Sequence, residues 1–188
     1  GALAPGWSVT GIAVGPNQVD FKTFEARFAA DSGPGVLLAT RYVRNEGRGD
    51  ERRGAQVHRF EAAGSLAWTV EVPRHDGDLE GIRGIDVTSD GAGGVIASWV
   101  DWWQTFGPYV LHTDETMQRY SSSGAPLWPA GTASPTYPYV EQDGAGGAYF
   151  FGSAYGTQSG IPALEVHRRL GDGSLPPGWP PAGIAVTQ

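Results

Sequence analysis

Side chains that could carry out catalysis are present, but they lack the spacing that catalysis needs. The four histidines form no H-x-x-x-H metal-binding pair, the chain has no cysteine, and no G-x-S-x-G motif supplies a serine nucleophile. A glycosidase needs a pair of carboxylates, and the candidates for that role are Asp76, Asp78, Glu80 and Asp101. Such residues also occur on any acidic surface. The sequence therefore predicts a non-enzymatic protein with no catalytic residue, no metal site and no cofactor.

Two segments without an equivalent elsewhere in the chain are better candidates for binding. Residues 44–54 are dense in both charges, and residues 102–116 concentrate aromatic side chains. We expect both to be loops, and aromatic rings in a loop are typical of a platform for a sugar ring or an apolar protein surface. A plug that folds back over the sheet would account for the same rings. The predicted ligand-binding residues are Arg48, Asp50, Trp102, Trp103, Phe106 and Tyr109.

The charged segment also contains the tripeptide Arg48-Gly49-Asp50, which integrins read on extracellular ligands. A chain this rich in glycine and arginine produces such a triplet by chance, and charges in loops are usually only solvated. The tripeptide is therefore a weak signal, and integrin-type adhesion is disfavoured relative to recognition of a sugar or a protein surface.

The elements that must position these segments are repeated along the chain. Residues 1–14 (GALAPGWSVTGIAV) align with residues 173–186 (GSLPPGWPPAGIAV), with nine of the fourteen positions identical. Three markers, one of them the tryptophan of this motif, recur in a fixed order, which indicates units of roughly 50 to 60 residues. They are the aspartates Asp31, Asp90 and Asp143, the arginines Arg59, Arg119 and Arg169 in QVHRF, TMQRY and VHRRL, and the tryptophans Trp7, Trp68, Trp128 and Trp179.

Each repeated marker has a functional and a structural interpretation. The tryptophans could stack on sugars, but recurrence at equivalent positions favours packing between neighbouring units. The aspartates could bind calcium, yet one carboxylate per turn supplies few of the six to eight oxygens that calcium takes, which favours a turn cap. The arginines could line an anion pocket, but a repeated polar residue on a strand more often forms a fixed pair between strands. The structural interpretation is preferred for all three.

Each unit divides into four expected strands separated by turns. In the middle unit these are residues 85–89, the apolar run 95–100, residues 117–120, and a last strand around Leu127 and Trp128. The glycine-rich stretches 90–94 and 143–147 are predicted to form equivalent tight hairpins, because glycine adopts positive φ without strain. No segment has helical periodicity. The predicted fold is all-β, a propeller-like array of about three four-stranded antiparallel blades, with very low helix content.

The middle unit resembles the repeats of secreted bacterial β-propeller proteins, in which D-G-x-G-G precedes an apolar strand with W-x-D, then Q-R, a turn and G-x-x-L-W. The matching residues are Asp90, Gly91, Gly93, Gly94, Trp99, Asp101, Gln118, Arg119, Gly124, Leu127 and Trp128. The resemblance implies an extracellular or cell-surface bacterial module. It divides the chain into the outer strand of a preceding blade (1–14) and three blades (15–72, 73–133 and 134–188).

Composition excludes some partners and leaves others open. The formal charge of -7 opposes binding to nucleic acid, and no long apolar run provides a membrane span. The expected function is a non-catalytic extracellular binding or scaffold module for a glycan or a surface protein. The alternatives are a subunit that assembles with further copies or further blades, and a fragment of a propeller glycoside hydrolase. The absence of charge in residues 3–14 and 175–186 favours assembly through strand edges, which the prolines there partly block.

Overall fold

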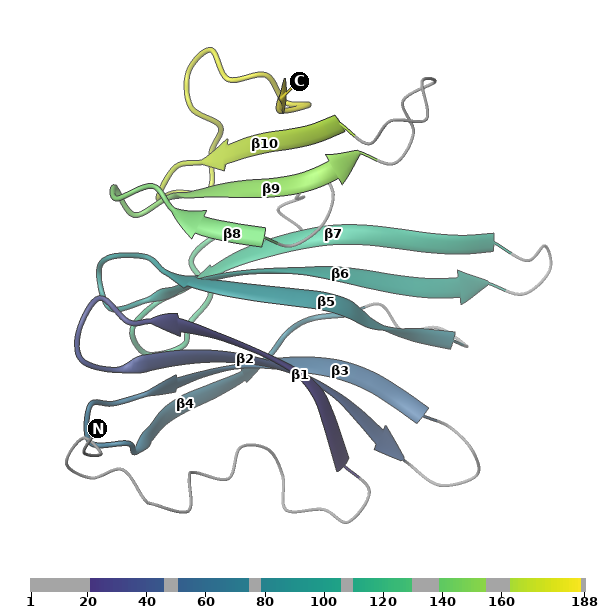
Figure 1. The fold of residues 1–188 in the computed structure, drawn as a ribbon, viewed down its shortest axis with the longest axis vertical. Helices are drawn as coiled ribbons and strands as arrows, with labels where there is room; N and C mark the ends of the chain where they lie inside the picture. Colours follow the sequence, from purple (N-terminus) through teal and green to yellow (C-terminus); the bar gives the residue numbers. More distant parts are fainter. Residues whose placement is uncertain are drawn as a thin grey trace.

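The computed structural model describes residues 21–45, 51–74, 79–105, 110–129, 139–154 and 163–186. These residues form β-strands and no helix, which confirms the all-β class and the low helix content (Figure 1). They accordingly include no helix of the length and apolar character that crossing a bilayer requires. The strands are β1 (Phe21–Ala30), β2 (Val36–Asn45), β3 (Glu51–Phe60), β4 (Leu66–Glu71), β5 (Leu79–Ser89), β6 (Val95–Thr105), β7 (Val110–Tyr120), β8 (Tyr139–Gln142), β9 (Ala148–Ala154), β10 (Ala163–Arg169) and β11 (Ile184–Val186).

The strands fall into three successive antiparallel groups, which lie one above another in Figure 1. We call them unit 1 (β1 to β4), unit 2 (β5 to β7) and unit 3 (β8 to β11). Within each unit, strands that follow one another in the chain pair with one another. Units 1 and 2 are joined into one sheet by a single parallel pair between Arg53 of β3 and Gly81 of β5.

The fourth strand expected in unit 2 is reduced to one bridge between Tyr120 and Pro126, so the strand predicted around Leu127 and Trp128 is wrong. Prolines cannot donate to a ladder, and Pro126 and Pro129 flank this stretch. The Gln118 side chain replaces the missing backbone pairs. Its amide donates to the Trp128 carbonyl at 3.1 Å and its oxygen accepts from the Trp128 N–H at 2.9 Å.

The predicted hairpins at 90–94 and 143–147 are confirmed. The N–H of Asp90 donates to the Gly94 carbonyl at 3.2 Å, and the N–H of Asp143 donates to the Gly147 carbonyl at 3.0 Å. In the first turn Gly91 has φ of 77° and Gly93 of 84°, and the second turn repeats these values within about one degree. Such angles strain any residue with a Cβ, which explains why the turns are rich in glycine.

Apolar side chains pack between the units rather than within one of them. One buried cluster joins unit 1 to unit 2 and includes Leu37, Val57, Val87 and Trp99. A second joins unit 2 to unit 3 and includes Ile96, Met117, Trp128, Val140 and Phe150. Unit 2 therefore buries one face against unit 1 and the other against unit 3, as stacked repeats do.

Candidate ligand-binding site

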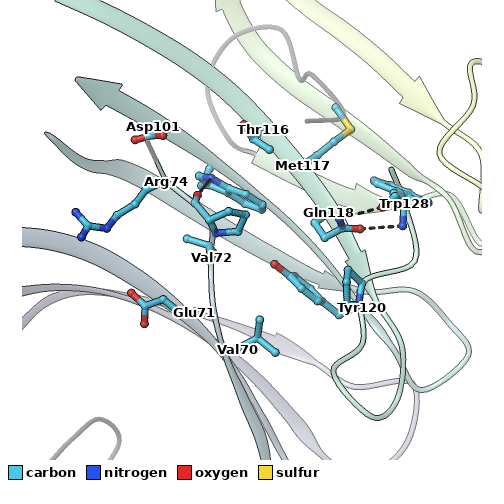
Figure 2. A pocket seen from close by; sticks show the side chains of 13 residues that line it. Val70, Glu71, Val72, Arg74, Asp101, Thr116, Met117, Gln118, Tyr120 and Trp128 are labelled. Atoms are coloured by element: carbon cyan, nitrogen blue, oxygen red, sulfur yellow. Dashed lines mark hydrogen bonds between the residues drawn. The ribbon is translucent and has the colours of Figure 1, made fainter. Parts of the chain in front are cut away.

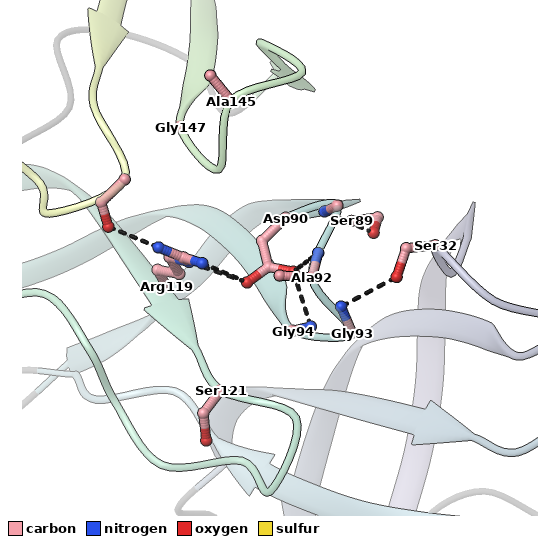
Figure 3. Close-up of polar contacts among 12 residues, drawn as sticks. Ser32, Ser89, Asp90, Ala92, Gly93, Gly94, Arg119, Ser121, Ala145 and Gly147 are labelled. Atoms are coloured by element: carbon pink, nitrogen blue, oxygen red, sulfur yellow. Dashed lines mark hydrogen bonds and ion pairs between the residues drawn. The ribbon is translucent and has the colours of Figure 1, made fainter.

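The repeated aspartates and arginines form a clasp that closes each turn. In unit 2, Oδ1 of Asp90 accepts hydrogen bonds from the backbone N–H groups of Ala92 and Gly94 at 2.8 and 2.7 Å. Its Oδ2 pairs with the Arg119 guanidinium at 2.8 Å (Figure 3). Asp31 pairs with Arg59 in the same way in unit 1, at 2.9 Å. The carboxylates are engaged within their own turns, which supports the turn-cap interpretation.

In unit 3 the clasp uses Arg168, so the prediction of Arg169 is wrong. Arg168 lies opposite Tyr149 as Arg119 lies opposite Ile96, and it pairs with Asp143 at 2.8 Å. The alignment of VHRRL with QVHRF and TMQRY is one residue out of register with the strand pairing, because the sequence does not distinguish between two adjacent arginines. Burial raises the pKa of Asp143, but the hydrogen bonds from Arg168 and from two backbone N–H groups outweigh it and leave that pKa below its ordinary value.

Tryptophan and arginine also fasten each unit to the next one. The indole N–H of Trp68 and Nη1 of Arg59 both donate to the Ser122 carbonyl of unit 2, at 2.9 and 3.3 Å. Trp128 and Arg119 repeat this on the Gly171 carbonyl of unit 3, at 3.0 and 2.7 Å. The prediction that these tryptophans pack between units is confirmed for Trp68 and Trp128.

Trp179 departs from this pattern and Trp7 lies outside the described residues. In unit 1, Trp68 lies opposite the clasp arginine Arg59. In unit 3 the pairing of β10 with β11 reaches Val166 and Ile184, and two more pairs in the same register would place Ala182 opposite the clasp arginine Arg168. Trp179 instead occupies a proline-rich turn, where its ring contacts that of Tyr149 at 6.4 Å. The segment from the turn glycine to the repeated position is longer in unit 3, with nine residues from Gly173 to Ala182 against four from Gly64 to Trp68, and Trp179 falls within this longer segment.

The two segments expected to be loops are largely strand. β2 and β3 extend through Asn45 and from Glu51, while β6 and β7 extend through Thr105 and from Val110. Their ends lie on the same side of the molecule in Figure 1. The insertions therefore lengthen two hairpins, since β2 with β3 and β6 with β7 pair over longer stretches than β9 with β10 in unit 3.

The predicted binding residues do not all lie on one face. Trp102 and Trp103 are consecutive residues of β6 and so point to opposite faces of the hairpin. The Arg83 guanidinium lies 4.7 Å from the Trp102 ring, and the Trp103 ring stacks on His112 at 5.0 Å. The other predicted residues, Arg48, Asp50, Phe106 and Tyr109, lie outside the described residues.

A cavity of about 730 Å³ lies between unit 1 and unit 2. The end of β4 and the segment after it form one wall, and residues of β6, β7 and the segment after β7 form the other (Figure 2). Its lining is mainly apolar, with polar groups from both walls. The lining residues are Val70, Glu71, Val72, Pro73, Arg74, Trp99, Asp101, Thr116, Met117, Gln118, Tyr120, Pro126 and Trp128.

The hydroxyl of Tyr120 points into this cavity (Figure 2). The residue is 2% exposed, and its buried hydroxyl oxygen has no hydrogen-bond partner among the described residues. Burial raises the pKa of the hydroxyl, so it stays protonated and can donate a hydrogen bond. Leaving a buried polar group unpaired costs about 1 to 3 kcal/mol, which a ligand atom would recover only if it reached the hydroxyl oxygen.

Part of the cavity wall is formed by residues of unit 2 that differ in type from their equivalents in unit 1. Trp99 lies opposite Thr116, and the equivalent pair in unit 1 is Thr40 with Gln56. The indole of Trp99 donates to the Pro73 carbonyl at 3.1 Å, which ties the two walls together. Sequence reasoning assigned Trp99 only to the repeat motif and missed Tyr120. A comparison of the units position by position would have singled out both.

Asp101 is the polar residue at one end of the cavity and is 2% exposed. It was one of the candidates for a carboxylate pair that the sequence analysis did not favour, and the other candidates, Asp76, Asp78 and the Glu80 side chain, lie outside the described residues. No three His, Cys, Asp or Glu side chains of the described segments gather as a metal site. No protein-family model and no curated protein matches this chain, so its function must be argued from the site.

Proposed function

We propose that this chain is a non-catalytic binding module that takes up a sugar ring, or a ring of similar chemistry, in the cavity between units 1 and 2. The observation that carries the proposal is the buried and unpaired Tyr120 hydroxyl on the cavity wall. The volume of about 730 Å³ falls in the range of small-molecule sites.

The chemistry of the walls favours this class of ligand. A sugar ring has an apolar face that packs on aromatic side chains and hydroxyl groups that need partners. Trp99 and Tyr120 supply the aromatic surface, and Asp101, Arg74 and Glu71 supply polar groups around it. A purely apolar ligand would leave the Tyr120 hydroxyl without a partner, and a ligand without an apolar face would gain little from the rings.

Trp103 extends the same surface toward the tip of the hairpin. Side chains alternate along β6, so Trp103 lies on the face that carries Trp99 and Asp101. The predicted aromatic hairpin and the cavity therefore share one face of unit 2. A ligand longer than one ring would run from Tyr120 toward Trp103.

We also propose that the three units are propeller blades of an extracellular bacterial protein, as the resemblance of the middle unit implies. The first strands of the units, β1, β5 and β8, contact one another in series, which is the arrangement of innermost strands around a propeller axis. The repeated clasps between successive units support the same interpretation.

The test is to block the cavity and leave the fold intact. Thr116 is half-buried on the cavity wall, and Thr113 is exposed on the opposite face of β7. A panel of mono- and disaccharides is screened by saturation-transfer NMR against the wild type, Thr116→Phe and the control Thr113→Phe. We expect binding by the wild type and the control, and loss of binding in Thr116→Phe with an unchanged circular dichroism spectrum. Equal binding by all three proteins would place the ligand elsewhere.

A further inference from the structure

The cavity lies where unit 2 lacks its fourth strand. In unit 1 the third strand, β3, pairs with β4, and this ladder joins Val57 to Val70. Met117 is the equivalent of Val57, since each lies two residues before the clasp arginine of its unit, Arg119 or Arg59. Met117 lines the cavity (Figure 2). The cavity therefore occupies the place that β4 fills in unit 1.

A hydrogen bond at the end of β7 shows which way the backbone of Met117 points. In an antiparallel pair the N–H and C=O of one residue point to the same side, and the side alternates along the strand. The Arg119 carbonyl accepts from the Leu127 N–H at 2.7 Å, so it points away from β6. The pairing of β6 with β7 has no bulge between Arg119 and Met117. Met117 therefore also points its N–H and C=O away from β6, toward the place that a fourth strand would fill.

Among the described residues of this edge, Met117 alone presents open backbone groups to the cavity. It is 0% exposed and no described strand pairs with the outer edge of β7 beside it, although buried backbone groups are nearly always hydrogen-bonded. Arg119, the next outward-pointing residue, is engaged, because its N–H donates to the Gln118 side-chain oxygen at 2.9 Å and its carbonyl accepts from Leu127. Glu115, the outward-pointing residue on the other side, does not line the cavity. A ligand thus meets one N–H donor and one C=O acceptor.

These two groups match two neighbouring hydroxyl groups on a sugar ring. The nitrogen and the oxygen of one residue are separated by its Cα and its carbonyl carbon, and in an extended strand both lie on the same side of the chain. Two hydroxyl oxygens on adjacent ring carbons are separated by those carbons in the same way, and equatorial neighbours lie side by side. A hydroxyl group can both donate and accept. One hydroxyl can therefore accept from the N–H while its neighbour donates to the C=O.

We propose that the Met117 backbone is the specificity-determining contact of the cavity, and that it selects sugars with two adjacent free hydroxyl groups. The N–H of Met117 donates to one hydroxyl oxygen, and the neighbouring hydroxyl donates to the Met117 carbonyl. The ring then lies in the cavity that Trp99 and Tyr120 also line. This inference rests on the proposed function, since it specifies how the cavity recognises its sugar. A ligand held in this way replaces, at one ladder position, the strand that unit 2 lacks.

Selective labelling makes this contact directly observable, because Met117 is the only methionine of the chain. Protein that carries ¹⁵N- and ¹³C-carbonyl-labelled methionine gives one amide signal and one enriched carbonyl signal in NMR spectra. Saturation with the sugar that binds best in the saccharide panel is expected to move both signals downfield, as new hydrogen bonds do. One monodeoxy analogue should lose the amide shift and another the carbonyl shift, each with about tenfold weaker binding. The two missing hydroxyls should be neighbours on the ring.

The matched controls are the cavity variant Thr116→Phe, whose Met117 signals should no longer respond to the sugar, and Thr113→Phe, whose signals should respond like those of the wild type. Two results would overturn the inference and leave the proposed function intact. In the first, saturation transfer shows that a sugar binds in the cavity but the Met117 signals do not move. In the second, the hydroxyls that control the two signals are not neighbours. If no sugar of the panel binds, the proposed function fails and the inference fails with it.

Discussion

Phe60 and Tyr120 occupy the same register position in successive units, Phe60 opposite Val36 and Tyr120 opposite Val95, and they differ by one hydroxyl group. Both rings are buried, at 3% and 2% exposure. Unit 1 is built with a ring but without a hydroxyl at this position, and unit 3 carries Arg169 there, opposite Ala148. The hydroxyl of Tyr120 is an addition that the fold does not require, which is why we assign it to a ligand.

The clasp between Asp90 and Arg119 is expected to be a major source of stability. Asp90→Ala removes the acceptor of two backbone N–H groups and leaves the Arg119 guanidinium without its carboxylate. Breaking a buried ion pair typically costs about 3 to 5 kcal/mol. Urea unfolding should show a loss of this order. Asp172→Ala removes an exposed turn carboxylate that bonds Ser174 and should cost clearly less; equal losses would mean that the clasp has no special role.

The junction between units 1 and 2 depends on the absence of a side chain at Gly81. A Cβ at this position would lie 2.7 Å from Cβ of Arg53 and 3.2 Å from Nε1 of Trp102. Gly81→Ala should therefore destabilise the protein by about 1 to 3 kcal/mol through overpacking. Gly33→Ala is the matched control, because nothing lies within 4 Å of its added Cβ. A Gly81→Ala protein as stable as the control would show that Arg53 and Trp102 can move to accept the added Cβ at little cost in stability.

Stability is expected to fall in mild acid because of His58. The imidazole is 1% exposed and lies between the hydroxyls of Thr40 and Thr69, at 3.0 and 2.9 Å. Burial lowers its pKa from 6.5 to about 4. The unfolded chain thus binds a proton at a higher pH than the folded protein. The contribution of His58 to the free energy of unfolding is fully present above pH 6.5 and is lost as the pH falls toward 4. The total loss amounts to about 3 kcal/mol.

The matched variant for this pH dependence is His58→Gln, because glutamine stands at the equivalent position in unit 2, as Gln118. Burial also lowers the pKa of His167, so the variant should retain part of the dependence. Urea unfolding between pH 7.5 and 4 measures the difference between the two proteins. Parallel stability curves would contradict the assignment to His58.

The adjacent tryptophans of β6 should respond differently to truncation. Trp103 lies on the face of the cavity and Trp102 on the opposite face, where Arg83 stacks on it. Trp103→Ala is expected to weaken binding of a disaccharide several-fold, whereas Trp102→Ala should leave the affinity within about twofold, which corresponds to about 0.4 kcal/mol. Isothermal titration calorimetry on both variants measures this. A larger effect from Trp102 would locate the ligand on the other face of the hairpin.

The repeat predicted the fold class and the turns because both depend on local chemistry. The turns at Asp90 and Asp143 follow from glycines that tolerate positive φ, and these are visible in the sequence. The lengths of the hairpins did not follow, since strand pairing at Trp102 and Trp103 depends on the partner strand. The choice of Arg168 over Arg169 depends on register in the same way.

The candidate site was only partly predictable from the sequence. Aromatic residues near position 102 marked the correct hairpin, and Trp103 shares the face of the cavity. The cavity itself arises where β4 of one unit meets β6 and β7 of the next, a contact between residues far apart in the chain. Tyr120 resembled a repeated core aromatic, and its significance is visible only once its hydroxyl is seen to lack a partner.

The affinity of wild type and Tyr120→Phe for the sugar that binds best in the panel tests the central claim most directly. Calorimetry should show an affinity loss of about tenfold, the size of one hydrogen bond or about 1.4 kcal/mol. The melting temperature should stay the same or rise, because the variant no longer buries an unpaired hydroxyl. Equal affinities of the two proteins, or a large fall in melting temperature without a change in binding, would show that the Tyr120 hydroxyl serves the fold and that the cavity is not the binding site.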